Sequence, residues 1–294
     1  MKPNNKFLNQ SQEFWATIKL LSQKLGYTKR KNRKRGELPL INIPSLDEVL
    51  AIYNSLDLNT NKLYYNNKLT ELGKLVFEYF EYRAEILNNF IQYRFMNLDE
   101  SVELFKELED KFEYKVPLAY NKQKKGQKIP LYFTSIINFL IESNIGENQC
   151  SYSSGELTAF TQHKFPVRSL SRRVDGSFPK VINPVALWEI KEYYYTTSFG
   201  SKVADAVYET MLDGYELIEV RKSLNIEIKH YLMIDGKLTW WVKGRSYLCR
   251  LIDAMHMGLI TEVLFGKEVM ERIPELTKEW IEFYEQHKNI LEGN

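Results

Sequence analysis

The sequence has few of the features that mark secreted, membrane-spanning or disulfide-stabilised proteins. Its only two cysteines, Cys150 and Cys249, lie far apart and lack metal-ligand spacing. Reduced thiols are therefore expected rather than a disulfide framework. No apolar run reaches the roughly 18 residues of a membrane span, and residues 1–5 lack the apolar core of a signal peptide. We expect a soluble cytoplasmic protein with no membrane partner.

The sequence also lacks a large excess of charge of one sign, and it lacks two common ligand-binding motifs. The net charge is +2, from 40 basic and 38 acidic residues, so the overall balance implies no acidic partner. The chain has no P-loop and no glycine-rich dinucleotide fingerprint. It does have a 44% hydrophobic fraction over 294 residues. That is enough for a sizeable core in one large or two modest domains.

The first half of the chain reads as a mainly helical region, residues 1–148. Apolar residues at three- and four-residue steps predict helices near 14–25, 71–96, 98–112 (capped by Asp99) and 131–141. Ser45, followed by two acidic residues, predicts the start of a further helix through Leu56. A soft boundary is placed in the polar stretch 144–149. We expect this region to bind DNA or to select its sequence.

The second half, residues 149–294, alternates between helix and strand patterns. A capping box at Ser153 predicts a helix to about His163. Strands are expected near 167–174, 181–190, 226–234 and 261–265, and further helices near 201–217, 244–257 and 273–287. This alternation predicts an α/β fold, with helices on the faces of a sheet.

Two short segments of the second half carry the residues for a metal-dependent reaction. Glu189 and Lys191 are two apart on a predicted strand, so their side chains point to the same face. Asp175 ends the preceding predicted strand, and a hairpin can bring it beside them. The two carboxylates and the Ile190 backbone carbonyl can hold Mg²⁺ through oxygen ligands. Lys191 can then position or help deprotonate a metal-bound water and stabilise negative charge.

The segments Val174-Asp175-Gly176 and Trp188-Glu189-Ile190-Lys191, with their acidic residues 14 apart, resemble the motif of the PD-(D/E)XK nucleases. This superfamily includes many type II restriction endonucleases. The resemblance covers roughly residues 152–265 and implies a central mixed sheet flanked by helices. It makes Asp175 and Glu189 metal ligands and Lys191 the catalytic lysine, with Mn²⁺ able to replace Mg²⁺. Glu156 matches a further acidic position of many members, and valine replaces the proline of the motif.

The Glu-x-Lys pattern occurs three times, so the assignment rests on its surroundings. Glu109 and Lys111 lie in a helical pattern, where the two side chains point apart. Glu227 and Lys229 are the rival pair, and Asp213 precedes Glu227 by 14 residues. We prefer the middle pair for two reasons. Asp213 falls in a predicted helix, and only the middle pair is followed by a helix and then a strand, as a parallel crossover needs.

Several basic and hydroxyl residues are candidates for nucleic-acid contacts. Arg173 is placed by strand alternation on the face of Asp175, although a salt bridge to Glu156 or Glu189 is an equal alternative. The other candidates lie where predicted helices begin, or in the basic run of residues 28–36, which is equally compatible with a solvated loop. They are Ser198, Ser201, Lys202, Lys243, Arg245, Lys29, Arg30, Lys31, Arg33, Lys34 and Arg35.

The sequence thus predicts a Mg²⁺-dependent endonuclease that hydrolyses phosphodiester bonds in double-stranded DNA. The resemblance implies a role in DNA restriction or phage defence. A homodimer is expected if both strands are cut at one site, because two-fold sites suit two-fold proteins. Two alternatives stay open. One is a nuclease of another role, in repair, transposition or RNA cleavage. The other is a non-catalytic nucleic-acid-binding protein.

Overall fold

A computed structural model describes residues 1–29, 38–111, 118–122, 128–152, 155–195 and 200–292. Its centre is a mixed five-stranded sheet in the order β13-β12-β11-β10-β7. The strands are β7 (Ser151–Tyr152), β10 (Gly176–Phe178), β11 (Ala186–Glu192), β12 (Lys229–Asp235) and β13 (Glu262–Phe265). β11, β12 and β13 run parallel, while β10 is antiparallel to both β11 and β7.

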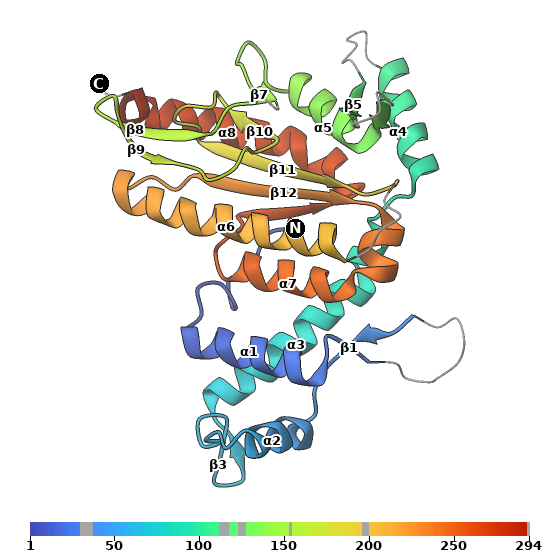
Figure 1. Cartoon of the computed structure of the whole chain (residues 1–294), viewed down its shortest axis with the longest axis vertical. Helices are drawn as coiled ribbons and strands as arrows, with labels where there is room; N and C mark the ends of the chain where they lie inside the picture. Colours follow the sequence, from blue (N-terminus) through green and yellow to red (C-terminus); the bar gives the residue numbers. More distant parts are fainter. Residues whose placement is uncertain (30–37, 112–117, 123–127, 153–154, 196–199, 293–294) are drawn as a thin grey trace.

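Helices cover both faces of this sheet (Figure 1). One face carries α6 (Ser201–Leu224) and α7 (Arg245–His256), which connect the parallel strands in turn. The other face carries α5 (Tyr132–Glu142) and α8 (Glu268–Glu292), and α4 (Leu98–Lys111) packs against α5. The expected α/β architecture with a helix-flanked sheet is confirmed. Among the described helices, none is both long and apolar enough to cross a membrane.

The α8 face is apolar where it meets β11 and β12. The Trp188 ring stacks on the Trp280 ring of α8, with centroids 5.2 Å apart and planes inclined by 7°. Gly176, opposite Trp188 on β10, leaves room for this indole, because a Cβ at position 176 would lie 2.0 Å from the ring. Trp188 therefore turns toward α8, and strand alternation sends Glu189 and Lys191 to the α6 face.

The helices of the first 90 residues form a separate cluster below the sheet in Figure 1. They are α1 (Gln12–Leu25), α2 (Leu46–Ser55) and α3 (Glu71–Asn89), and the turn Ile91–Tyr93 follows α3. Ser45 and Glu48 form the capping box of α2, as the predicted cap required. The α4 prediction was wrong in one detail. Asn97 rather than Asp99 caps the helix, accepting a hydrogen bond from the Glu100 N–H at 2.9 Å.

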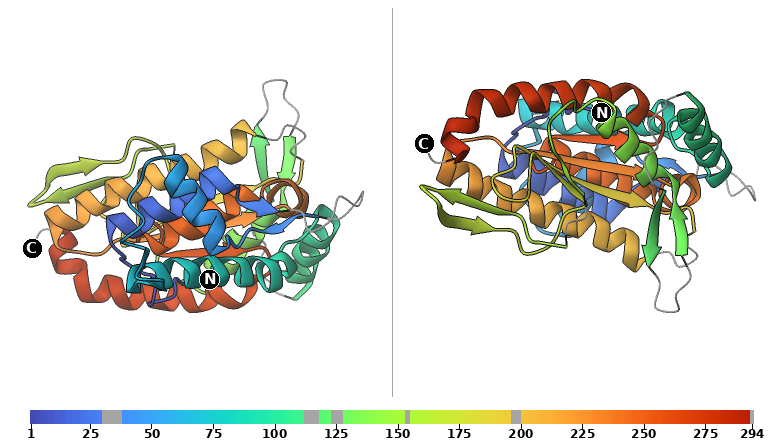
Figure 2. Two further views of the ribbon diagram at one scale, coloured as in Figure 1. Left: turned by 90° about the horizontal axis from the view of Figure 1, so that it is seen from below. Right: turned by 90° about the horizontal axis from the view of Figure 1, so that it is seen from above.

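Short antiparallel strand pairs decorate the fold and were not expected from the sequence. They are β1 (Thr28–Lys29) with β2 (Leu40–Ile41), β3 (Tyr64–Tyr65) with β4 (Lys68–Leu69), and β5 (Ala119–Lys122) with β6 (Lys128–Leu131). The pair of β5 and β6 stands beside α5, as the right-hand view of Figure 2 shows. None of these pairs shares a ladder with the central sheet.

The region before β10 differs most from the prediction. Where a helix to His163 was expected, β8 (Ala159–Gln162) pairs with β9 (Phe165–Ser169). His163 and Lys164 both have positive φ, as a two-residue hairpin turn requires. The strand expected over 167–174 ends at Ser169, and residues 171–175 form bends and irregular chain instead. Ser153 lies outside the described residues.

Candidate active site

Glu189, Lys191 and Asp175 meet where β10 and β11 diverge. Pairing of the two strands ends at Gly176 and Trp188, so Ile190 lies beyond the ladder. In place of a backbone acceptor on β10, the carboxylate of Asp175 accepts a hydrogen bond from the Ile190 N–H at 2.7 Å. The N–H and C=O of one strand residue point to the same side. The Ile190 carbonyl therefore faces Asp175, as the predicted oxygen-ligand set requires.

Helix α6 completes the site with two acidic residues that the sequence analysis did not assign to it. Asp213 is buried, and Glu209, one helical turn earlier, is 40% exposed at its side chain. Glu209 Oε2 lies 2.8 Å from Lys191 Nζ, which also lies 2.9 Å from Glu189 Oε2. The spacing of four residues places both acids on one side of the helix. The four-residue spacing of these two acids is visible in the sequence. Nothing in the sequence indicated that the helix would turn this acidic side toward the sheet.

Arg172, rather than Arg173, is the arginine of the site. Its Nη1 lies 2.9 Å from Glu189 Oε1 and 2.6 Å from Asp213 Oδ2, and its Nη2 lies 3.4 Å from Glu209 Oε2. Arg173 is exposed. The strand alternation that placed Arg173 on the face of Asp175 does not apply to the bends of residues 171–175, while a phosphate contact by Arg173 stays a prediction.

The site holds more negative than positive charge. Among the described residues, the side chains of Asp175, Glu189, Glu209 and Asp213 have two cationic neighbours, Arg172 and Lys191. Burial and the neighbouring Glu189 charge raise the pKa of Asp175 to about 6, and burial and Glu189 also raise the pKa of Asp213 to about 7 although Arg172 opposes the shift. Within the described residues, Glu189 Oε1 and Asp213 Oδ1 accept no hydrogen bond, although Glu189 Oε1 lies 2.9 Å from Arg172 Nη1 in an ion pair. Such a site can take up a further cation.

Glu189 and Lys191 remain charged despite their burial. Burial would raise the pKa of Glu189, but Lys191 and Arg172 outweigh it and the pKa is lowered. Burial would lower the pKa of Lys191, yet Glu189, Glu209 and Asp175 outweigh it and the pKa is raised. Lys191 is therefore a firmly protonated cation, suited to stabilising negative charge rather than to accepting a proton.

The donor set fits a hard divalent cation, but only in part through side chains. Within the described ranges, no group of three or more His, Cys, Asp or Glu side chains is arranged to hold a metal ion. The fitting donors are the carboxylates of Asp175 and Glu189 and the Ile190 carbonyl, together with the surplus negative charge. Oxygen ligands of this kind suit Mg²⁺, which commonly keeps several waters. Glu156 is exposed in a bend rather than on a helix, so the helical position expected for it was wrong.

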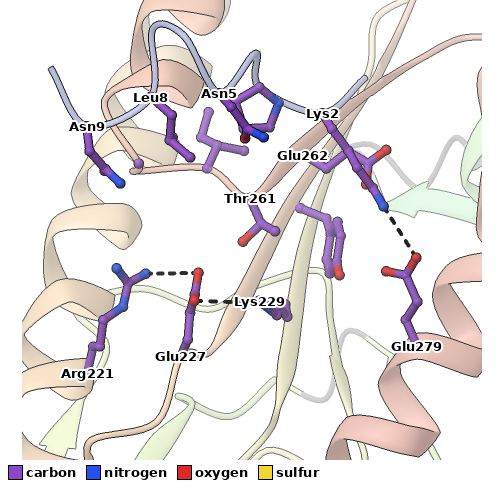
Figure 3. A pocket seen from close by; sticks show the side chains of 14 residues that line it. Lys2, Asn5, Leu8, Asn9, Arg221, Glu227, Lys229, Thr261, Glu262 and Glu279 are labelled. Atoms are coloured by element: carbon purple, nitrogen blue, oxygen red, sulfur yellow. Dashed lines mark hydrogen bonds and ion pairs between the residues drawn. The ribbon is translucent and has the colours of Figure 1, made fainter.

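The rival pair lies at the opposite end of β12 and forms a surface ion-pair cluster (Figure 3). Glu227 is 51% exposed at its side chain and lies 3.5 Å from Arg221 and 3.8 Å from Lys229. These residues line an open pocket of about 540 Å³ together with residues from the start of the chain, Lys2 among them. Asp213, which the rival assignment required, faces Glu189 through Arg172 instead. The geometry therefore favours the middle pair.

The residues considered for nucleic-acid contacts are scattered. Ser201 and Lys202 are exposed at the start of α6, whose N-cap is Gly200, and Lys243 is exposed at the end of the π-helix Leu238–Lys243. Arg245 is instead buried. It stacks on Trp241 with its guanidinium 4.5 Å from the ring centre, and it donates to the Pro39 carbonyl at 2.9 Å.

The basic run of residues 28–36 is described only at its start. Lys29 lies in β1 and pairs with Glu48 at 2.6 Å. Ser198 and the cations at positions 30–35 lie outside the described residues.

Comparison with protein families gives one match that covers more than half of the chain. Residues 96–280 match a family described as a domain of unknown function, DUF7687. The chain belongs to this family. Residues 1–90 match a second domain of unknown function, DUF7690. No curated protein and no solved structure matches the chain. All four acidic residues, Arg172 and Lys191 lie within the DUF7687 segment.

Proposed function

We propose that this DUF7687 chain is a Mg²⁺-dependent endonuclease of the PD-(D/E)XK type that cleaves double-stranded DNA. The observation that carries the proposal is the Asp175–Ile190 contact. It brings the buried carboxylate of Glu189, the half-buried carboxylate of Asp175 and a backbone carbonyl together, beside a charged lysine. When bound there, Mg²⁺ would lower the pKa of a bound water and neutralise charge on the phosphate.

The residues of the chain have separate roles in this proposal. Asp175, Glu189 and the Ile190 carbonyl would hold the metal. Lys191 would stabilise the negative charge that develops on the phosphate as water attacks. Glu209 holds the Lys191 ammonium from α6 at 2.8 Å and so fixes its position over the site. Burial of this network limits competing water, which strengthens each electrostatic contact.

A role in restriction or phage defence is part of the proposal and rests on the resemblance to restriction endonucleases. A homodimer is proposed for the case in which both strands are cut at one site. A nuclease with a repair, transposition or RNA substrate would use the same residues. Cleavage tests on each nucleic acid separate these possibilities.

The direct test is cleavage of plasmid and phage DNA by wild type and Glu189→Ala, with Mg²⁺ or EDTA. Wild type is expected to cut only with Mg²⁺, and the variant to lose at least about 10²-fold in rate, because a metal ligand and the lysine's partner are both removed. Glu227→Ala is the matched control, because Glu227 is the acidic residue of another Glu-x-Lys pair. This variant should cut DNA at the wild-type rate. Cutting by Glu189→Ala at the wild-type rate would exclude this site.

The basic run of residues 29–35 gives an independent prediction about DNA binding. Replacing its six cations by glutamine should weaken DNA affinity and flatten its dependence on salt, because each lost phosphate contact removes about 0.9 from the slope of log K against log salt. The measurement is fluorescence anisotropy with a labelled duplex, at salt concentrations from about 50 to 200 mM. An unchanged slope would show that the run does not touch DNA.

A further inference from the structure

Arg172 occupies the centre of the carboxylate cluster. Its two terminal nitrogens make a two-pronged contact with Glu189, at 2.9 Å to Oε1 and 3.1 Å to Oε2. The same guanidinium bridges Glu189 on β11 to Asp213 on α6. Both acids are buried, while the Arg172 side chain is 21% exposed. Arg172 is thus a cation that reaches in from the surface to neutralise the site.

Arg172 reaches the cluster from irregular chain, and its side chain is partly exposed. Residues 171–175 pair with no strand, so the arginine is held by its side-chain contacts rather than by a ladder. A guanidinium binds phosphate with the same fork geometry that it uses for carboxylate. Arg172 therefore has two competing sets of partners, the carboxylates of the site and the phosphate of a bound nucleic acid.

We propose that Arg172 is a counter-ion that exchanges partners. Without metal it holds Glu189 and Asp213. When a divalent cation binds the Glu189 carboxylate, Arg172 releases it and contacts the phosphate of the substrate. This inference rests on the proposed nuclease function and adds a substrate-binding residue to it. It implies that Arg172 opposes metal binding in the free protein, because two cations compete for one carboxylate.

The test measures Mn²⁺ binding by wild type and Arg172→Gln with isothermal titration calorimetry. Arg172→Gln is expected to bind Mn²⁺ about tenfold or more tightly, since a nearby charge shifts the affinity of a carboxylate for a cation by this order. A purely structural arginine would give weaker binding when removed. The matched control is Arg168→Gln. Arg168 reaches α6 from β9 and lies 3.0 Å from Glu216, away from Glu189, so its removal should leave Mn²⁺ affinity unchanged.

A second measurement tests the phosphate contact, using Ca²⁺ as the cation and a labelled DNA duplex. Arg172→Gln should lose several-fold in DNA affinity with Ca²⁺ and change little in EDTA, where the arginine is held by carboxylates. Arg172→Lys covers the case in which the glutamine variant does not fold. The single ammonium of the lysine cannot make the two-pronged contact with Glu189. Mn²⁺ should therefore bind Arg172→Lys a few-fold more tightly than it binds wild type.

The outcomes separate this inference from the proposed function. Wild-type or weaker Mn²⁺ affinity in every folded Arg172 variant overturns the role of Arg172 but leaves the nuclease proposal standing. If neither wild type nor any folded variant binds Mn²⁺, the metal site itself is wrong and both proposals fail. Tighter Mn²⁺ binding together with unchanged DNA affinity in Ca²⁺ overturns the exchange to phosphate.

Discussion

Replacement of Lys191 by alanine is expected to lower DNA cleavage by about 10²–10³-fold, the usual effect of removing a group that stabilises transition-state charge. DNA affinity should stay close to that of wild type, because Lys191 is largely buried and is engaged by Glu189 and Glu209. Single-turnover cleavage with Mg²⁺ measures the first quantity, and anisotropy of a labelled duplex measures the second.

The rival lysine provides the control for this experiment. Lys229 begins β12 and also follows a glutamate by two residues, but it lies at the other end of the sheet, in the cluster of Figure 3. Lys229→Ala should cut DNA at the wild-type rate. Loss of DNA binding by Lys191→Ala would mean that the lysine supports the structure of the site and would contradict a role in the chemical step.

The second large effect concerns stability. Arg83→Met is expected to lower the free energy of unfolding by about 3–5 kcal/mol, the usual cost of breaking a buried ion pair from one side. Arg83 on α3 is fully buried and lies 2.9 Å from Asp253 on α7. It also donates to Ser22 on α1 at 3.0 Å, while Tyr79 donates to Asp253 at 2.6 Å. Removal of the guanidinium would leave the Asp253 carboxylate buried without its counter-ion.

Chemical denaturation of three variants measures this effect. Arg83→Met/Asp253→Leu removes both charges and should recover part of the loss. Arg94→Met breaks an exposed ion pair to Glu271, at 3.7 Å, and should cost less than about 1 kcal/mol. An equal, small loss for Arg83→Met and Arg94→Met would contradict the prediction. The pair joins the DUF7690 segment to the DUF7687 segment, so its loss should affect the whole chain.

Much of the fold followed from periodicity, because long helices and buried strands have strong patterns. The prediction for α6 began at the correct residue, Ser201, but ended seven residues early. The structure buries the acid Asp213 on this helix and leaves the aromatic Tyr215 48% exposed. Hydrophobic periodicity identifies the apolar face of a helix. It cannot show that a buried acid has an arginine partner from another element.

Part of the candidate site was predictable from short patterns, and the expected hairpin brought Asp175 to β11. Glu189 and Lys191 share a strand, and alternation sufficed to put them on one face. Arg172 needed knowledge of the bends at 171–175, which no short pattern indicated. The helix expected at 153–163 failed because the capping-box pattern at Ser153 outweighed the turn at His163 and Lys164, whose positive φ is not visible in the sequence.

The packing around β11 also gives the site an optical reporter. Trp188 and Trp240, two of the five tryptophans, adjoin the cluster. Trp188 directly precedes Glu189 on the strand, and the Trp240 indole N–H donates to the Lys191 carbonyl at 3.3 Å. Both rings are buried, so their emission depends on neighbouring charges and on the backbone of β11 rather than on solvent. The intrinsic fluorescence of the unlabelled chain should therefore register cation uptake at the site as it happens.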